Sequence, residues 1–185
     1  MLETMYPLCL TGAWSTCAKS VSDTLNDWLF DSSSLTQRLK DKFSRFEVTV
    51  LSEKRIQLSD DSRMVLDCDA HQAFVREVLL VCDGKPAVYA QSVIPDSSLE
   101  NGLSSLTSLG TKPLGEVIFN NEEMIRLPIQ AAAFSADSQL VRSLIALKVL
   151  AEPQETLWGR RSVFRIHNQP ISVTEVFLPD SEVYW

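Results

Sequence analysis

The stretch that most constrains the fold is the run of residues 74–94, which is predicted to form two antiparallel strands joined by a tight turn. Its turn is Asp83-Gly84, a dipeptide typical of two-residue hairpin loops, because both residues adopt positive φ at little cost. The first strand is apolar on both faces apart from Arg76 on one face and Glu77 on the other. A strand with two apolar faces lies inside a sheet, so this hairpin is predicted to be central and to carry an inward-facing arginine.

The stretch 157–179 is predicted to contain a second hairpin, with strands at 162–166 and 171–178 and its turn at residues 167–170. Alternation along its second strand places Glu175 on the same face as Val173 and Phe177, so that one apolar face carries a carboxylate in its middle. Burying even a neutral polar group without a partner costs about 2–7 kcal/mol, and an unpaired charge costs more. Glu175 is therefore expected to have a partner or a ligand.

Two interpretations of Arg76 and Glu175 follow from the residues alone. In the first, the two side chains form a buried ion pair with each other. In the second, they flank a pocket between the sheet and the helices, where Arg76 binds a carboxylate and Glu175 faces a hydroxyl group or a proton. Arg160 and Arg161 form a further basic pair, for which the composition favours a solvated position at the start of a strand over a role in binding.

The remaining elements follow from the spacing of apolar residues. Helical spacing predicts helices at residues 20–30, 35–43 and 135–151, and alternation predicts a strand at 46–51 with 54–58 as its antiparallel mate. The first two helices are joined by a serine-rich segment and form either a packed pair or a lid, of which the pattern favours the packed pair. Residues 1–19 are expected to be irregular, and residues 59–70 to be a surface loop. The resulting class is α+β, an antiparallel β-sheet with flanking helices, in one domain of 185 residues.

Composition and charge argue against several classes of function. The net charge of −7 and the pI of about 4.8 disfavour a surface that binds nucleic acid or anionic membranes, which needs clustered Lys and Arg. Four cysteines without a Cys-x-x-Cys pair, and only two histidines, disfavour a zinc site, so no metal is expected. The sequence shows neither a signal-peptide pattern nor an apolar run of roughly 20 residues, so a cytoplasmic protein without a membrane span is expected.

Five blocks of the sequence, covering most of the chain from about residue 25 onward, resemble the chorismate–pyruvate lyase (chorismate lyase) family. In chain order they are Asp31-Ser-Ser-Ser-Leu-Thr-Gln-Arg38, Val75-Arg-Glu-Val-Leu-Leu80 with Asp83-Gly84, Leu109-Gly-Thr-Lys-Pro-Leu-Gly115, Leu157-Trp-Gly-Arg-Arg-Ser162, and Thr174-Glu-Val-Phe-Leu-Pro179. The last two blocks are specific in combination, whereas each of the others is weak alone.

The resemblance implies an antiparallel-sheet α+β fold with an internal ligand cavity closed by helical flaps. It also implies the conversion of chorismate to 4-hydroxybenzoate and pyruvate, the first committed step of bacterial ubiquinone synthesis, by a monomer that uses no cofactor. The expected partners are therefore the small-molecule substrate and product, and no nucleic acid.

The resemblance also assigns individual residues to the ligand. Arg76 would anchor the ring carboxylate and Glu175 would face the 4-hydroxyl group, and these two are the catalytic candidates. Leu114 would contact the ligand through its backbone. Leu35 occupies a flap position that is often Met in relatives, and this exchange keeps the volume and the apolarity of the side chain.

Two further expectations accompany these assignments. Neutralisation of the pyruvyl side of the substrate falls to Arg160 or to Arg161, and the sequence does not choose between them. Residues 120–156 are longer than expected for the family and include the predicted helix at 135–151. This added segment would alter the rim of the cavity or form a contact surface.

A second function, from a different class, is a non-catalytic sensor of small molecules such as aromatic carboxylates, because effector-binding domains of some bacterial transcription regulators share this fold. Such domains normally follow a DNA-binding helix-turn-helix, for which residues 1–19 are too short and irregular. The acidic net charge also argues against DNA binding. A third and less specific function is an interaction module that uses the added helix.

Overall fold

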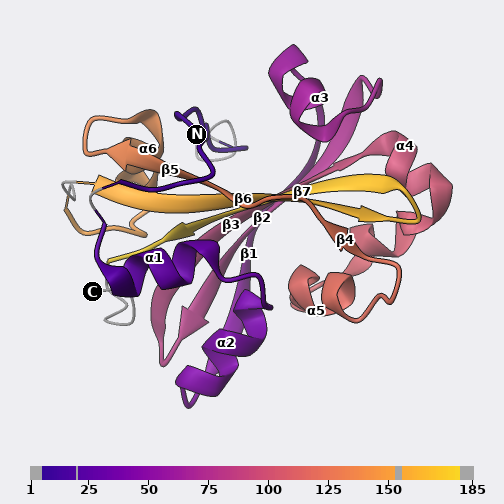
Figure 1. Cartoon of the computed structure of the whole chain (residues 1–185). Coiled ribbons are helices and arrows are strands. Elements are labelled where there is room, and N and C mark those ends of the chain that lie inside the picture. The colour runs from indigo at the N-terminus through magenta and orange to yellow at the C-terminus, as the bar shows by residue number, and fades with distance from the viewer. Residues whose placement is uncertain (1–5, 20, 153–155, 180–185) are drawn as a thin grey trace.

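The structure, a computed structural model, describes residues 6–19, 21–152 and 156–179, and predictions for residues 1–5, 20, 153–155 and 180–185 fall outside it. In this part of the chain, seven strands form one antiparallel sheet in the order β1-β2-β3-β7-β6-β4, and β5 also pairs with β6 (Figure 1). The strands are β1 (Phe46–Gln57), β2 (Gln72–Cys82), β3 (Lys85–Pro95), β4 (Ile125–Arg126), β5 (Gln130–Ser135), β6 (Thr156–Ile166) and β7 (Gln169–Phe177).

Helices cover both faces of the sheet, which confirms the predicted α+β class (Figure 1). Helices α1, α2 and α5 lie on one side, and α3 and α6 lie on the other. The helices are α1 (Asp23–Phe30), α2 (Leu35–Lys42), α3 (Asp60–Leu66), α4 (Asp96–Ser98), α5 (Leu114–Phe119) and α6 (Gln139–Ala146), with a π-helical turn at Leu99–Leu103 and a 3-10 helix at Ser104–Ser108.

Alternation along β2 divides the hydrophobic core between the two faces. Val78 and Leu80 pack in one cluster with Leu29 of α1 and Leu39 of α2. Leu79, which points the other way, packs in a second cluster with the apolar side of α6. β2 therefore has two apolar faces because it lies between β1 and β3 with a helical layer on each side, and the predicted central hairpin is confirmed.

The predicted turns are also confirmed, and serine caps define where the first two helices begin. Asp83 and Gly84, which join β2 to β3, have φ of 47° and 80°. His167 and Asn168, which join β6 to β7, have φ of 49° and 63°. α1 and α2 each begin after a serine whose hydroxyl accepts a hydrogen bond from a backbone N–H of the first turn. Local turn and cap chemistry thus determines where these elements begin and end.

Two predictions between residues 46 and 70 are wrong. Residues 46–57 form a single strand that pairs with β2, and a bulge between Val50 and Ser52 disturbs the alternation that suggested a break there. The stretch expected to be a surface loop contains α3. Ser59 caps this helix, and Asp60 and Asp61 occupy its first turn, where carboxylates interact favourably with the unpaired N–H groups. The charged residues that suggested a loop instead favour a helix start.

The predicted helix at 135–151 is shorter in the structure. The Ser138 hydroxyl accepts a hydrogen bond from the Val141 N–H at 3.3 Å, which places the start of α6 at Gln139. The residues up to Ser135 belong instead to β5, which extends the sheet. Residues 6–19 contact this strand through a β-bridge between Ser15 and Ala131 and through the edge-to-face packing of Trp14 against Phe134.

Candidate active site

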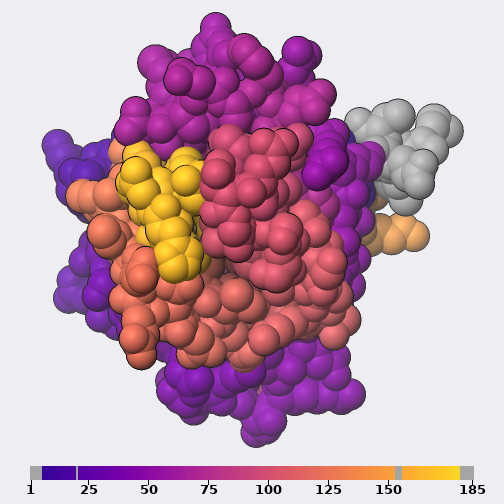
Figure 2. All heavy atoms as spheres, turned by 90° about the vertical axis from the view of Figure 1, so that its right-hand side faces the viewer, coloured from indigo at the N-terminus to yellow at the C-terminus, as the bar shows by residue number. Residues whose placement is uncertain are grey.

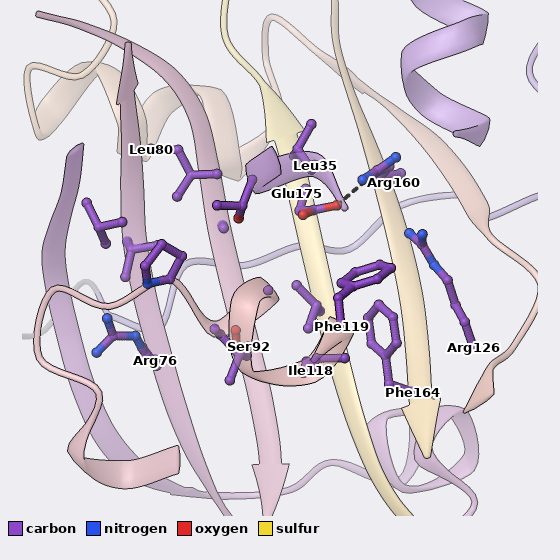
Figure 3. A pocket seen from close by; sticks show the side chains of 18 residues that line it. Leu35, Arg76, Leu80, Ser92, Ile118, Phe119, Arg126, Arg160, Phe164 and Glu175 are labelled. Atoms are coloured by element: carbon purple, nitrogen blue, oxygen red, sulfur yellow. Dashed lines mark hydrogen bonds and ion pairs between the residues drawn. The ribbon is translucent and has the colours of Figure 1, made fainter. Parts of the chain in front are cut away.

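A pocket lies between the sheet and the layer that contains α2 and α5 (Figure 3). Five polar or charged side chains from the strands face it: Arg76, Ser92, Arg126, Arg160 and Glu175. The other lining residues are mostly apolar: Leu35, Thr36, Val48, Val78, Leu80, Ala90, Pro113, Leu114, Gly115, Ile118, Phe119, Phe164 and Val173. An apolar pocket with a few convergent polar groups is the usual form of a small-molecule site.

The register of the sheet explains why these charged residues share one pocket. Arg76 lies on β2 and Glu175 on β7, with β3 between them. Glu175 is opposite Ala90 on β3 and Arg160 on β6, and Ser92, the next residue of β3 on the same face, is opposite Arg76. Neighbouring strands are about 4.8 Å apart, and the two residues are also offset by two positions along β3, so the backbones at Arg76 and Glu175 are separated by roughly 12 Å.

Arg76 is almost fully buried, with 2% of its surface exposed. Its Nη1 forms an ion pair with Glu53 of β1, whose side chain is 34% exposed. Its Nη2 donates to the carbonyl oxygen of Gly110 at 2.6 Å, in the segment that leads to α5. The direct ion pair with Glu175, the first interpretation drawn from the sequence, is not formed.

Glu175 pairs with Arg160 on the adjacent strand, at 2.6 Å between Oε2 and Nε. The Arg160 guanidinium also donates, through Nη1, to the carbonyl oxygens of Trp28 and Asp31, both at 2.9 Å. These carbonyls lie at the C-terminal end of α1, where the helix leaves its last carbonyls without intrahelical partners. Arg160 therefore connects the pocket floor to the helices above it.

The predicted solvated position of the arginine pair is wrong for Arg160, which is 1% exposed. β6 begins at Thr156, so the pair lies inside the strand, and consecutive residues point to opposite faces. Arg161 is half-buried on the face away from the pocket. There its Nη2 donates to Gln130 Oε1 at 2.7 Å, and its guanidinium lies 4.6 Å from the centroid of the Trp14 ring.

Leu35 and Leu114 lie in the roof of the pocket as the first residues of α2 and α5, and both are buried. The two helices contact each other: Lys40 forms an ion pair with Glu116, and a Cβ on Gly115 would lie 3.0 Å from Thr36 Oγ1. The pocket is thus covered by α2 and α5.

Figure 2 shows the outer surface of the segment that leads into α5. Residues 96–119 pack beside the tip of the β6–β7 hairpin in this view, and the Ser98 hydroxyl donates to the carbonyl oxygen of Pro170 at 2.9 Å. Apolar residues of this segment, among them Leu106 and Ile118, pack with Phe164 in a third core cluster. This packing holds α5 over the pocket.

Sequence reasoning missed Arg126, which enters the pocket from β4. This strand is two residues long, too short to produce a periodic pattern, and the prediction left its surroundings unassigned. Burial lowers the pKa of Arg126 to about 10, and the positive charge of Arg160 acts in the same direction, while the carboxylates of Glu175 and Asp31 oppose it. The signal that could have identified Arg126 is a lone cation between two apolar stretches.

The described residues hold no group of three His, Cys, Asp or Glu side chains that could bind a metal ion. In the same residues, no helix is long and apolar enough to cross a membrane. What the pocket offers is three guanidinium groups and one carboxylate in an apolar enclosure. Such a site can bind an anion, exclude water and orient a hydroxyl group.

Comparison with solved structures shows the fold. The chain matches a GntR-family transcriptional regulator from Bacillus cereus with a TM-score of 0.54 at 10% identity, covering 74% of this chain and 93% of that one. It also matches the effector domain of PhnF from Mycobacterium smegmatis with a TM-score of 0.52 at 13% identity, covering 80% and 89%. At these identities, the similarity extends to the fold alone.

Comparison with sequences gives a more specific result. The family model described as chorismate lyase matches residues 11–185. A probable chorismate pyruvate-lyase from Pseudoalteromonas translucida is 39% identical, over 97% of this chain and 98% of its own length. One from Psychromonas ingrahamii is 38% identical, over 98% and 97%. The chain belongs to the chorismate lyase family.

Proposed function

We propose that this protein converts chorismate to 4-hydroxybenzoate and pyruvate. The observation that carries the proposal is the placement of Arg76 and Glu175 on one pocket face, two strands apart, each held by a different partner. A carboxylate anchor and a hydroxyl acceptor at this separation match the two ends of 4-hydroxybenzoate. Family membership supports the same reaction, since full-length relatives carry the name probable chorismate pyruvate-lyase.

The chemistry places modest demands on the protein. Chorismate loses the proton on C4, and the bond from C3 to the ether oxygen breaks with its electron pair on the oxygen, so the ring becomes aromatic and the side chain leaves as enolpyruvate. A proton added to the methylene carbon of enolpyruvate gives pyruvate, which balances the proton lost from C4. Aromatisation supplies the driving force, so no strong nucleophile is required. The pocket contributes by holding the ether and the C4 hydrogen in a reactive geometry, by excluding water and by placing cations near the departing oxygen.

Each pocket residue has a role in this reaction. Arg76 binds the ring carboxylate, and its contacts with Glu53 and Gly110 hold the guanidinium in place. Glu175 accepts a hydrogen bond from the 4-hydroxyl group, and Arg160 orients that carboxylate. The apolar side chains of Leu35 and Leu114 cover the ring.

The two arginines considered for the pyruvyl side are not equivalent. Arg160 lines the pocket beside Glu175, whereas Arg161 lies on the other face of the sheet. We therefore assign Arg160, and not Arg161, to the environment of the departing group.

Further expectations follow from the resemblance to the family. The protein is expected to act as a monomer in the cytoplasm, without nucleic acid, and its helical cover predicts slow release of the product. All described elements belong to one sheet and its two helical layers, which supports a single domain. In the segment 120–156, α6 packs on the face away from the pocket, whereas β4 brings Arg126 into the pocket, so the segment contributes both to the core and to the pocket lining.

The deciding experiment is incubation of the purified protein with chorismate while the absorbance of 4-hydroxybenzoate is followed. The proposal predicts steady formation of equal amounts of 4-hydroxybenzoate and pyruvate. Binding of 4-hydroxybenzoate without any turnover would instead identify a sensor of the same fold. Glu175→Ala serves as the internal control, because its turnover must fall if the observed activity belongs to this pocket.

A further inference from the structure

The charges in the pocket do not balance. Three guanidinium groups line it, and two carboxylates pair with them: Glu53 with Arg76, and Glu175 with Arg160. Among the described residues, Arg126 has no carboxylate within ion-pairing distance. The pocket therefore carries one positive charge beyond its own partners.

The neighbours of Arg126 cannot supply the missing anion. The Asp31 carboxylate, which is close enough to influence Arg126, is engaged by Arg38 at 2.7 Å. The Glu175 carboxylate is engaged by Arg160. Within the described part of the chain, Arg126 donates its hydrogen bonds instead to neutral oxygens, the Ser162 hydroxyl and the carbonyls of residues 31–33.

The geometry of these bonds indicates what the guanidinium can accept. Nε and Nη2 of Arg126 both donate to the single oxygen of Ser162, at 3.0 and 2.7 Å. Nη1 donates to the Ser32 carbonyl at 2.9 Å. The Nε–Nη2 edge is a fork that binds the two oxygens of a carboxylate in parallel. Here one hydroxyl oxygen occupies that fork, and it can turn to donate its own proton to a carboxylate that takes its place.

The position of Arg126 sets it apart from Arg76. Its Cα is opposite Phe164 on β6, and the guanidinium lies 5.1 Å from the Phe164 ring centroid and 5.8 Å from that of Phe119. Figure 3 shows the guanidinium directed toward the Arg160–Glu175 pair, at the end of the pocket away from Arg76. Arg126 lies on β4, four strand spacings from β2, which carries Arg76, so their backbones are roughly 19 Å apart and the two long side chains reach toward each other across the pocket. Two carboxylates of one ligand can therefore be bound separately.

We propose that Arg126 binds the carboxylate of the enolpyruvyl group and thereby distinguishes the dianionic substrate from the product. The inference rests on the proposed function. With the ring carboxylate at Arg76, the second carboxylate of chorismate reaches the fork of Arg126. After the ether bond breaks, this carboxylate leaves with pyruvate, and 4-hydroxybenzoate has no group for Arg126. Arg126 is thus a specificity residue for substrate, while Arg76 serves substrate and product alike.

The kinetic test compares substrate with product in the variant Arg126→Gln. We expect kcat/KM for chorismate to fall by about 100-fold, in the range of one lost charge-assisted fork. The Kd of 4-hydroxybenzoate should change by less than about threefold, whereas in Arg76→Gln both quantities should worsen. Equal losses of substrate turnover and product affinity in Arg126→Gln would overturn the proposal.

A binding test separates this inference from the proposed function. The probes are 3-(carboxymethoxy)benzoate, a stable dianion, and 3-methoxybenzoate, the matched monoanion. The wild-type protein should bind the dianion at least about tenfold more tightly, and in Arg126→Gln this preference should disappear. The measurement needs no turnover, so it decides the role of Arg126 even if chorismate is not a substrate. An unchanged preference in Arg126→Gln would contradict the carboxylate site.

Two further variants control for damage to the fold. Arg126→Lys keeps the charge without the fork and should retain an intermediate preference for the dianion. Arg165→Gln removes an arginine of β6 that pairs with the exposed Asp67, and it should leave the preference as in the wild type. A loss in Arg165→Gln equal to that in Arg126→Gln would assign the effect to general electrostatics, against the proposal.

Discussion

Two consecutive residues of β2, Arg76 and Glu77, are buried to the same extent on opposite faces of the sheet, at 2% and 1% exposure. Glu77 Oε1 accepts hydrogen bonds from the Leu8 N–H at 2.7 Å, the Tyr89 hydroxyl and Gln91 Nε2. Every donor belongs to the protein, and the charge is satisfied without a ligand. On the Arg76 face, the guanidinium groups outnumber the carboxylates that pair with them. A buried charge whose hydrogen-bonding partners all belong to the protein has a structural role. Buried guanidinium groups that outnumber the carboxylates paired with them require an anionic ligand.

The environment of Tyr89 agrees with a Glu77 face that is filled by the protein itself, which we call the closed face. Burial raises the pKa of Tyr89 well above its usual value, and the neighbouring Glu77 carboxylate raises it further. The hydroxyl therefore stays protonated and remains a donor to Glu77. Substitutions on the two faces should consequently separate into effects on activity and effects on stability.

The largest effect is expected for Arg76→Ala. Loss of the anchor for the ring carboxylate should lower kcat/KM for chorismate by about 100- to 1,000-fold, equivalent to about 3–4 kcal/mol. Thermal stability should change little, because Glu53 is one-third exposed and becomes hydrated when its partner is removed. Steady-state kinetics and a thermal melt check both points. A loss of less than about threefold in kcat/KM would remove Arg76 from the site.

The opposite pattern is expected for Glu77→Leu. Removing the carboxylate leaves the Leu8 N–H and the Tyr89 hydroxyl buried without an acceptor, which should lower the free energy of unfolding by about 2–3 kcal/mol. At a temperature where the variant is folded, its kcat/KM should stay within about threefold of the wild type. Urea denaturation and the same kinetic assay provide the measurements. A large loss of activity at unchanged stability would mean that Glu77 also serves the ligand.

Gly159→Ala should lower both stability and activity, because the added Cβ meets atoms that belong to both faces of the sheet. The loss of activity should be smaller than that in Arg76→Ala. A Cβ at this position would lie 3.1 Å from Phe134 and from Val176 on the closed face, and 3.1 Å from the Glu175 carbonyl oxygen. Overpacking of this kind costs about 1–3 kcal/mol of stability. Because the shift reaches the backbone of Glu175, we also expect kcat to fall several-fold. Unchanged stability would show that the Glu77 face can accept the added methyl group without the overpacking that these distances indicate.

The smallest effect is expected for Cys82. This residue lies on the same face of the sheet as the pocket but outside the pocket, in the core cluster that includes residues of α1. Burial, with a contribution from Asp83, raises its pKa to about 11. An unfolded thiol has a pKa of about 8.5, so between these values the unfolded chain loses a proton that the folded chain keeps, and stability falls as pH rises. At pH 9, this amounts to roughly 1 kcal/mol.

The measurement for Cys82 is urea denaturation at pH 7 and pH 9. Cys82→Ala should show a smaller loss of stability over this interval than the wild type. An identical loss in both proteins would show that Cys82 ionises as freely in the folded chain as in the unfolded one, so that this end of the pocket face is open.

Much of the fold could be predicted from the sequence, because short-range chemistry specifies it. The turn residues Asp83 and Gly84 act within a few residues, and the turn predicted there is confirmed. The serine caps of α1 and α2 act over the same short range. The predicted end of the first strand lies too early, at residue 51. The bulge there depends on pairing with β2, and the alternation within one strand carries no information about that pairing. α3 was missed because its carboxylates suit a helix start as well as a loop.

The candidate site was only partly predictable, for a related reason. Alternation placed Arg76 and Glu175 on apolar faces, but the partners that hold them, Glu53 and Arg160, lie on neighbouring strands. Arg160 was assigned to solvent because the sequence did not show that β6 begins before it. Arg126 reaches the pocket through tertiary packing alone. Periodicity identifies the face on which a residue lies, and pairing between strands decides what it meets there.

The most direct test of the central claim is a crystal structure of the protein with 4-hydroxybenzoate. The account predicts the ring beneath α2 and α5, with its carboxylate within hydrogen-bonding distance of Arg76 and its hydroxyl at Glu175. A ligand bound instead on the opposite face, in the groove lined by Trp14, Gln91 and Arg161, would contradict it.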